Sequence, residues 1–239
     1  MARYAFFIDL STCAGCQSCT VSCQNKNGLD PEMTFTHIHR YQEGNFPNLK
    51  STFVVNQCLH CDNPPCTDVC PTGATYKTAD GPVQIDYKQC IGCQYCVSAC
   101  PYGARTYDEK ARVVKKCSEC YDRLQSGQTP ACVQTCITGA RQIGDIDDPK
   151  SPIHQLIAQP GTVQVGGTQF YFRLTEGIAR SVLPADSRES GVTYAWQSIL
   201  HPFGQLLMGG AAGAVLLSAA AFMAKSVRKE AEDRNGQHE

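Results

Sequence analysis

The sequence predicts an α+β chain in which short strands and short helices carry cysteine loops, followed by one long apolar helix. Three observations predict it. The 239 residues include 16 cysteines, many more than an ordinary globular chain contains. Short β-prone segments lead into the cysteine groups. An uncharged apolar stretch near the C-terminus is long enough to cross the hydrocarbon core of a bilayer.

Composition narrows the class of protein. The formal net charge is −1, so nucleic-acid binding is not predicted. Disulfide scaffolds are usually short and begin with a secretory signal. The opening MARYAFFIDLSTC has neither a positive segment before a long apolar stretch nor a twin-arginine pair, so no export signal is expected. The cysteine spacings, rather than the even count, decide what the thiols do.

The cysteines form four groups of four, and none is left over. Groups I and III follow C-x2-C-x2-C-x3-C, group II follows C-x2-C-x4-C-x3-C, and group IV follows C-x2-C-x11-C-x3-C. The members are Cys13, Cys16, Cys19 and Cys23 (I); Cys58, Cys61, Cys66 and Cys70 (II); Cys90, Cys93, Cys96 and Cys100 (III); and Cys117, Cys120, Cys132 and Cys136 (IV).

The spacing of a triplet and a distal fourth cysteine predicts paired iron–sulfur clusters. Three closely spaced thiolates can wrap a loop around one cubane, whereas the fourth opens a helix that points away and ligates the other cluster of a pair. The stretches CPTGA, CPYGA and CITGA follow this pattern at Cys70, Cys100 and Cys136. Proline pre-sets φ at a helix start, and glycine permits close backbone approach to the cluster.

Other metal chemistry fits the pattern less well. Zinc could bind the C-x2-C pairs, and group IV alone looks much like a zinc site. Zinc does not explain repeated triplets with a distal fourth cysteine. A radical S-adenosylmethionine enzyme would show a lone C-x3-C-x2-C, which is absent. An enzyme with an open iron would lack one cysteine, and none is missing.

The four groups, in this order, resemble the four-cluster ferredoxin-like electron-transfer subunits of molybdopterin oxidoreductases. That family includes the iron–sulfur subunits of dimethyl sulfoxide, polysulfide and tetrathionate reductases and of membrane-bound formate dehydrogenases. The resemblance covers roughly residues 1–150 and all sixteen ligand positions. Some relatives replace a group III cysteine with Trp and hold a three-iron cluster, but Cys90, Cys93 and Cys96 are all present, so four 4Fe–4S clusters are expected.

The resemblance also implies how the groups pair, which the spacing alone leaves open. Group I is expected to pair with group IV, and group II with group III. The implied ligand sets are Cys13, Cys16, Cys19 and Cys136 (set 1); Cys23, Cys117, Cys120 and Cys132 (set 2); Cys58, Cys61, Cys66 and Cys100 (set 3); and Cys70, Cys90, Cys93 and Cys96 (set 4).

The expected fold is two intertwined bacterial-ferredoxin-like units with two clusters each. Residues 1–50 with 105–150 would form one unit and residues 51–104 the other. Residues 151–201 would be an extension and linker. Strands are predicted in RYAFFIDLS, in STFVVNQ, in GPVQIDYKQC before group III and in RTYDEKARVVKKC before group IV. A hairpin around Gly166–Gly167 is predicted in residues 162–174.

Five residues near the groups invite a functional interpretation. His60 lies between two ligands, but the cysteine set is complete, so it is expected beside the cluster or on the surface. Lys115 and Lys116 could raise the potential of the neighbouring cluster through their charge or form an ordinary solvated pair. Tyr95 and Tyr102 are expected to pack around the clusters.

The C-terminal segment predicts a membrane anchor. No Lys, Arg, Asp or Glu occurs from residue 190 to 224, and residues 202–224 are long enough to span a bilayer. A buried soluble helix is the alternative. Cations follow at Lys225, Arg228 and Lys229, which places the polar tail of residues 225–239 in the cytoplasm and the cluster-bearing head in a bacterial periplasm. Such a head would need to be exported folded, with a partner.

The function expected from these features is electron transfer rather than catalysis. The chain would connect a molybdopterin catalytic subunit, with molybdenum or tungsten, to an integral membrane subunit that binds quinone or haem, at the inner membrane and in contact with lipid. The alternative is the iron–sulfur subunit of a membrane-bound hydrogenase or another quinone-linked complex without molybdenum. The substrate and the direction of electron flow are not predicted by the sequence.

Overall fold

The computed structural model describes residues 2–175 and 180–184. These residues belong to a compact unit formed by residues 1–190, and residues 191–239 group separately. The predicted span at 202–224, the tail at 225–239 and the end of the 151–201 extension therefore lie outside the described residues. In the described ranges, no helix is both long and apolar enough to cross a membrane.

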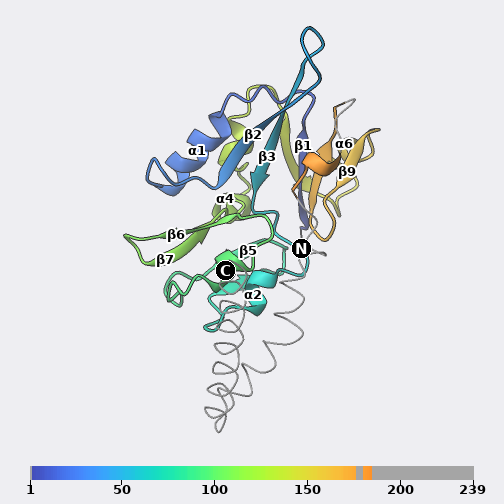
Figure 1. The fold of residues 1–239 in the computed structure, drawn as a ribbon. Helices are drawn as coiled ribbons and strands as arrows, with labels where there is room; N and C mark the ends of the chain where they lie inside the picture. The colour runs from blue at the N-terminus through green and yellow to red at the C-terminus, as the bar shows by residue number, and fades with distance from the viewer. Residues whose placement is uncertain (1, 176–179, 185–239) are drawn as a thin grey trace, which may run out of the picture. The chain divides into compact units, whose positions relative to one another are not determined.

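The described elements are short strands and short helices, as an α+β fold requires (Figure 1). The strands are β1 (Tyr4–Asp9), β2 (Thr36–Glu43), β3 (Lys50–Gln57), β4 (Thr75–Lys77), β5 (Val83–Ile85), β6 (Arg105–Asp108), β7 (Val113–Lys116), β8 (Arg141–Asp145), β9 (Thr162–Gln164) and β10 (Phe170–Arg173). The helices are α1 (Ser18–Asn27), α2 (Pro65–Asp68), α3 (Tyr95–Ser98), α4 (Tyr121–Gln125), α5 (Ala131–Gln134), α6 (Ile153–Ile157) and the 3-10 helix η1 (Arg180–Val182).

The first predicted strand and the predicted C-terminal hairpin meet in one sheet of order β8-β1-β10-β9. Strand β1 pairs antiparallel with β8 and parallel with β10. Because β1 lies inside the sheet and is covered on both faces, its residues 5–9 are all buried, and residues 5–8 form an apolar run rather than an alternation. The hairpin prediction is confirmed, with β9 antiparallel to β10 and Gly167 between them at a φ of 68°.

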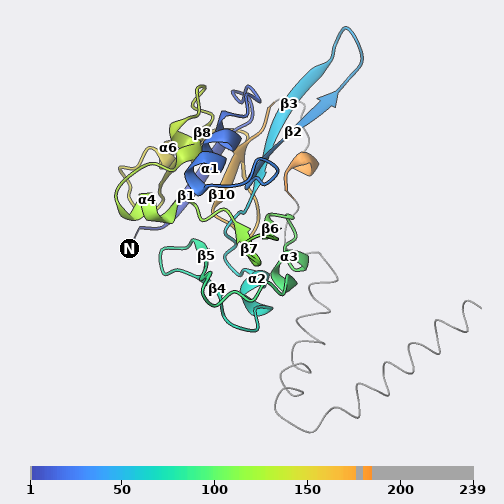
Figure 2. The ribbon, with the colours of Figure 1, turned by 90° about the vertical axis from the view of Figure 1, so that its left-hand side faces the viewer.

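Three two-stranded ribbons carry the rest of the cysteine region: β2–β3, β4–β5 and β6–β7. The strands predicted before groups II, III and IV correspond to β3, β5 and the β6–β7 hairpin. Strand β2 was not predicted because THIHRYQE is polar on both faces and is mostly exposed. Figures 1 and 2 show the β2–β3 ribbon projecting past the sheet, whereas α2, α3 and β4–β5 lie at the other end of the described unit.

The largest core joins the sheet to the cysteines. Phe6 on β1 stacks on Phe170 on β10 with ring centroids 4.9 Å apart, and the same apolar cluster includes Leu59 and Tyr102 beside group II and group III cysteines. The packing expected of Tyr102 is therefore confirmed, whereas Tyr95 is 53% exposed. The sheet holds the cysteine loops through continuous side-chain packing.

We predict that Phe170→Ala destabilises this unit by about 3–5 kcal/mol, because it empties a buried position that stacks on Phe6. Phe46→Ala removes the same atoms from a side chain that is 94% exposed and should change stability by less than about 0.5 kcal/mol. Thermal melting followed by the visible absorbance of the holoprotein compares the two. Equal melting temperatures would contradict the stated role of the Phe6–Phe170 stack.

Candidate metal centres

Each cysteine group begins with a loop that reverses the chain just before its second cysteine. The residue at that point has positive φ in all four groups: Gly15 at 64°, His60 at 46°, Gly92 at 68° and Glu119 at 62°. Glycine adopts this conformation without a steric penalty. His60 and Glu119 do not, and such residues cost of order 1–3 kcal/mol and concentrate at functional sites.

The third cysteine of each group is the second residue of a short helix. These cysteines are Cys19 on α1, Cys66 on α2, Cys96 on α3 and Cys132 on α5. Helix α1 packs against α5, and α2 packs against α3. The helices therefore bring group I beside group IV and group II beside group III.

The helix starts fall into two local types. Left-handed Gln17 and Gln94 precede α1 and α3, and prolines precede α2 and α5. Groups I and III accordingly share C-x-G-C-Q-x-C, and groups II and IV share P-x-C before the third cysteine. Each helix pair combines one start of each type. The similarity of group I to group III, and of group II to group IV, can be seen in these shared residues, although the cysteine spacings alone do not show it.

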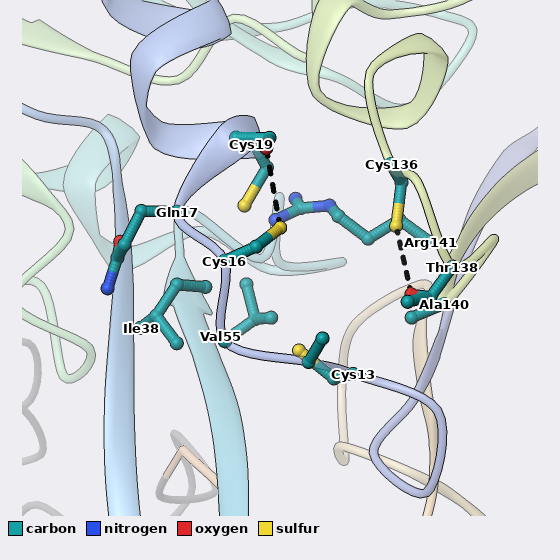
Figure 3. Close-up of a pocket in the computed structure, with 13 residues that line it drawn as sticks. Cys13, Cys16, Gln17, Cys19, Ile38, Val55, Cys136, Thr138, Ala140 and Arg141 are labelled. Carbon is teal, nitrogen blue, oxygen red and sulfur yellow. Dashed lines mark hydrogen bonds between the residues drawn. The ribbon is translucent and has the colours of Figure 1, made fainter.

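Three hollows are each lined by four cysteines, and each foursome matches one of the sets implied by the resemblance. The space between their walls, including the part open to solvent, is about 350, 280 and 300 Å³. The first, drawn in Figure 3, has Cys13, Cys16, Cys19 and Cys136 on its walls, with Arg141 reaching in from beside Cys136 toward Cys19. The other two are lined by Cys70, Cys90, Cys93 and Cys96, and by Cys58, Cys61, Cys66 and Cys100.

The remaining four cysteines are buried neighbours. Burial raises the pKa of Cys23 to about 12, with further contributions from Cys132 and Cys120. Burial also raises the pKa of Cys117 well above its usual value, with Cys23 and Cys132 adding to the effect. Cys23, Cys117, Cys120 and Cys132 are the cysteines that line none of these three hollows, and all four are buried.

The donor chemistry of these sites suits an iron–sulfur core. Burial and neighbouring thiols raise the pKa of Cys61 to about 12, so such thiols stay protonated without a cation to hold their charge. Metal coordination removes that proton. Backbone amides point at several sulfurs: Thr75 N lies 3.5 Å from Cys70 Sγ and Glu119 N lies 3.3 Å from Cys117 Sγ. These N–H groups are the donors that stabilise the charge of ligated thiolates.

A single small ion is not the natural occupant. Over residues 2–175 and 180–184, no three His, Cys, Asp or Glu side chains converge tightly enough to hold one metal ion. In a cubane, each thiolate binds a different iron, so its ligands stand farther apart than those of a zinc site.

Exposure differs between the four sets. In the hollow of Figure 3, Cys16 is exposed and Cys13 and Cys136 are partly buried. Cys70, Cys90 and Cys93 are likewise only partly buried. By contrast, every cysteine of the set around Cys23 is buried, and so are three of the four around Cys58. Two sets are therefore enclosed and two lie close to solvent.

The two enclosed sets meet at a buried polar junction. Lys116 is 2% exposed and its ammonium donates to the carbonyl oxygens of Val83 and Cys117. Lys115 instead pairs with Asp108, 2.6 Å away across the β6–β7 hairpin. The idea of an ordinary solvated lysine pair is therefore wrong for Lys116, and its charge lies inside the protein beside a ligand.

His60 and Glu119 complete this junction. His60 is 4% exposed, and its Nδ1 accepts the Val83 N–H at 2.9 Å. Burial and then the charge of Lys116 lower the pKa of His60 to about 3, and burial raises the pKa of Glu119. The 3.8 Å approach of His60 Nδ1 to Glu119 Oε2 is thus not an ion pair. His60 was expected beside the cluster or on the surface, and its burial agrees with the first of these and not with the second.

We predict that Gly92→Ala lowers iron content and thermal stability, because a Cβ at this φ of 68° would collide with the Arg112 carbonyl oxygen. Gly103→Ala is the matched control, since Gly103 also has positive φ but its added Cβ would meet nothing within 4 Å. The control should show only the backbone penalty of about 1–2 kcal/mol. Iron analysis and melting curves of both variants test this, and equal losses would show that space at Gly92 is unimportant.

The fold and the sites define an iron–sulfur protein of the ferredoxin type. Comparison with known proteins agrees: residues 49–146 match the family described as "4Fe-4S dicluster domain". The sequence is 40% identical over 196 residues to the B subunit of selenate reductase from Mesobacillus selenatarsenatis, covering 68% of this chain and 67% of the relative. It is 47% identical over 160 residues to the B subunit of tetrathionate reductase from Salmonella typhimurium, covering 66% and 64%.

A third relative is the B subunit of anaerobic dimethyl sulfoxide reductase from Escherichia coli, at 42% identity over 154 residues, or 61% of this chain and 75% of the relative. The protein belongs to this family of iron–sulfur B subunits of multi-subunit oxidoreductases. It is an electron-transfer subunit rather than the catalytic one, and its cofactors are four 4Fe–4S clusters.

Proposed function

We propose that this chain carries electrons between a molybdopterin catalytic subunit, with molybdenum or tungsten, and an integral membrane subunit that binds quinone or haem. Each bound cluster supplies one-electron redox chemistry. The observation that carries the proposal is the exposure pattern: two cysteine sets are enclosed and two are partly exposed. Such an arrangement would shield the inner clusters of an electron-transfer chain from water and leave only the outer clusters accessible to partner subunits.

We propose that the clusters are held by ligand sets 1 to 4 and that electrons pass through them in that order. Support for sets 1, 3 and 4 comes from the three four-cysteine hollows, and for set 2 from the mutual influence of its thiols. The order is supported by electrostatic interactions between neighbouring sets. Cys19 of set 1 raises the pKa of Cys132 of set 2, and Cys58 of set 3 raises the pKa of Cys117 of set 2. Arg105 is near cysteines of both sets 3 and 4.

The two outer sets are the proposed docking points. Val21 and Ile137, beside cysteines of set 1, are 53% and 75% exposed, and Ile91 and Tyr95, beside those of set 4, are 66% and 53% exposed. Exposed apolar side chains around a functional site are typical of surfaces that a partner covers. We place the catalytic subunit at set 1 and the membrane subunit at set 4, as in the family that the sequence resembles.

The domain organisation of the proposal is two intertwined units, residues 1–50 with 105–150 and residues 51–104. A transmembrane helix at 202–224 would anchor the subunit in the inner membrane, in contact with lipid, with the clusters in the periplasm and residues 225–239 in the cytoplasm. Its support is the uncharged length of residues 202–224 and the cations that follow. The relatives are named as reductase and dehydrogenase subunits, so the hydrogenase alternative gains no support.

We predict that Cys70→Ser alters the cluster of set 4 and leaves that of set 3, although Cys70 belongs to group II. Cys70 lines the hollow of Cys90, Cys93 and Cys96. Cys100→Ser is the matched control, expected to alter set 3 instead. Electron paramagnetic resonance of the reduced holoprotein should show one changed signal in each variant, and the changed signal should differ between the two variants. The same signal changed in both would overturn the pairing.

We predict that deleting residues from Gly204 onward releases the subunit and its catalytic partner from membranes. Quinone-linked activity should fall, whereas activity with a soluble dye should survive, because the catalytic end is unchanged. Protease added to the periplasmic face should digest the head of the full-length chain and spare the tail. Tail cleavage with a protected head would reverse the orientation, and a truncated chain that stays bound with full quinone activity would remove the anchor from the proposal.

A further inference from the structure

Two buried arginines occupy equivalent positions in the chain. Arg105 and Arg141 each follow the fourth cysteine of their group by five residues, in CPYGAR and CITGAR. Each is the first residue of a strand, β6 or β8, and they are 4% and 2% exposed. Group II has Thr75 at this position, as the first residue of β4. A guanidinium keeps its charge in proteins, so two permanent cations are held inside the cysteine region.

The Arg105 guanidinium bridges two ligand sets. Its Nη2 donates to Cys66 Sγ, of set 3, at 2.8 Å, and its Nη1 donates to Thr75 Oγ1 at 3.2 Å. Thr75 in turn donates its backbone N–H to Cys70 Sγ, of set 4, at 3.5 Å. The side chain of Arg105 also lies near Cys96 of set 4. No carboxylate is among its hydrogen-bond partners in the described structure, and the thiolates of a bound cluster would be its counter-charges.

The Arg141 guanidinium occupies the corresponding place between sets 1 and 2. Its neighbours include Cys19 of set 1 and Cys132 of set 2, and Figure 3 shows the side chain entering the first hollow. Its Nη2 donates to the Gln57 side-chain oxygen. Within the described ranges, its Nε and Nη1 are buried and make no hydrogen bond of standard geometry, although the guanidinium is close enough to Cys19 to interact with its thiol. Such orphaned donors are costly and are satisfied if the site holds sulfur acceptors beyond the thiols themselves.

From this geometry we propose that Arg105 and Arg141 are positioning residues that set the potentials of two clusters at once, one pair in each unit. The inference rests on the ligand sets of the proposed function. Reduction adds negative charge to a ligand set, and a fixed cation with hydrogen bonds to the ligating sulfurs favours that state. Because one guanidinium faces both sets of a pair, it raises both potentials together and leaves the difference between them largely unchanged.

The test is a potentiometric titration of the complete complex, followed by electron paramagnetic resonance, after Cys70→Ser and Cys100→Ser have assigned signals to sets 4 and 3. In Arg105→Gln, the signals of sets 3 and 4 should both move to lower potential. The expected shift changes the ratio of reduced to oxidised cluster at least about tenfold at fixed potential, or about 59 mV for one electron. Arg141→Gln should move the signals of sets 1 and 2 and leave the other two.

Arg3→Gln is the control, because it removes an arginine whose side chain is 53% exposed and paired with Asp147, and it should move no signal. Arg105→Lys keeps the charge but loses the two-pronged contact, so both signals should shift by less than in Arg105→Gln. If Arg105→Gln fails to load iron, Arg105→Lys decides the matter on its own. A shift confined to one signal, a shift of all four, or no shift would each overturn the proposal. If the ligand sets themselves were assigned wrongly, Cys70→Ser and Cys100→Ser would change the same signal, which would be seen before any arginine variant is measured.

Discussion

Every cysteine loop in this protein must reverse direction within three residues, and that reversal needs a residue with positive φ. Glycine supplies it in groups I and III, at Gly15 and Gly92, whereas His60 and Glu119 supply it in groups II and IV at the cost of backbone strain. Whereas the left-handed Gln17 and Gln94 lie at the starts of α1 and α3, His60 and Glu119 lie at the junction where the two enclosed cysteine sets meet. There the two side chains are buried with Lys116, so side chains fill a space that glycine would leave empty.

The same constraint explains how the units are assembled from two kinds of part. Groups I and III start their helices after left-handed glutamines, and groups II and IV after prolines. Helix α1 packs on α5 and α2 packs on α3, so each helix pair joins a group that turns at glycine to a group that turns at His60 or Glu119. The loops that turn at glycine lie toward the exposed sets, and the loops of His60 and Glu119 meet in the interior. The arginines at the starts of β6 and β8 repeat this internal symmetry.

Much of the fold was predictable because it is local. Strand β1, strand β3, the β9–β10 hairpin and the class of the fold follow from apolar patterning and turn residues. Strand β2 was missed because its residues are polar on both faces, and its partner β3 alone makes it a strand. The cysteine spacings predicted the kind of centre. They did not predict the buried state of Lys116 or the positions of Arg105 and Arg141, since those depend on packing between segments far apart in the chain.

The crossing over of the fourth cysteines has a consequence for biosynthesis. The hollow lined by the group III triplet contains Cys70, and the one lined by the group II triplet contains Cys100. Both are complete once synthesis has passed residue 100. The triplet at Cys13, Cys16 and Cys19 is made first, yet its hollow is closed by Cys136. The earliest thiols therefore wait longest for their fourth neighbour while the chain is being made.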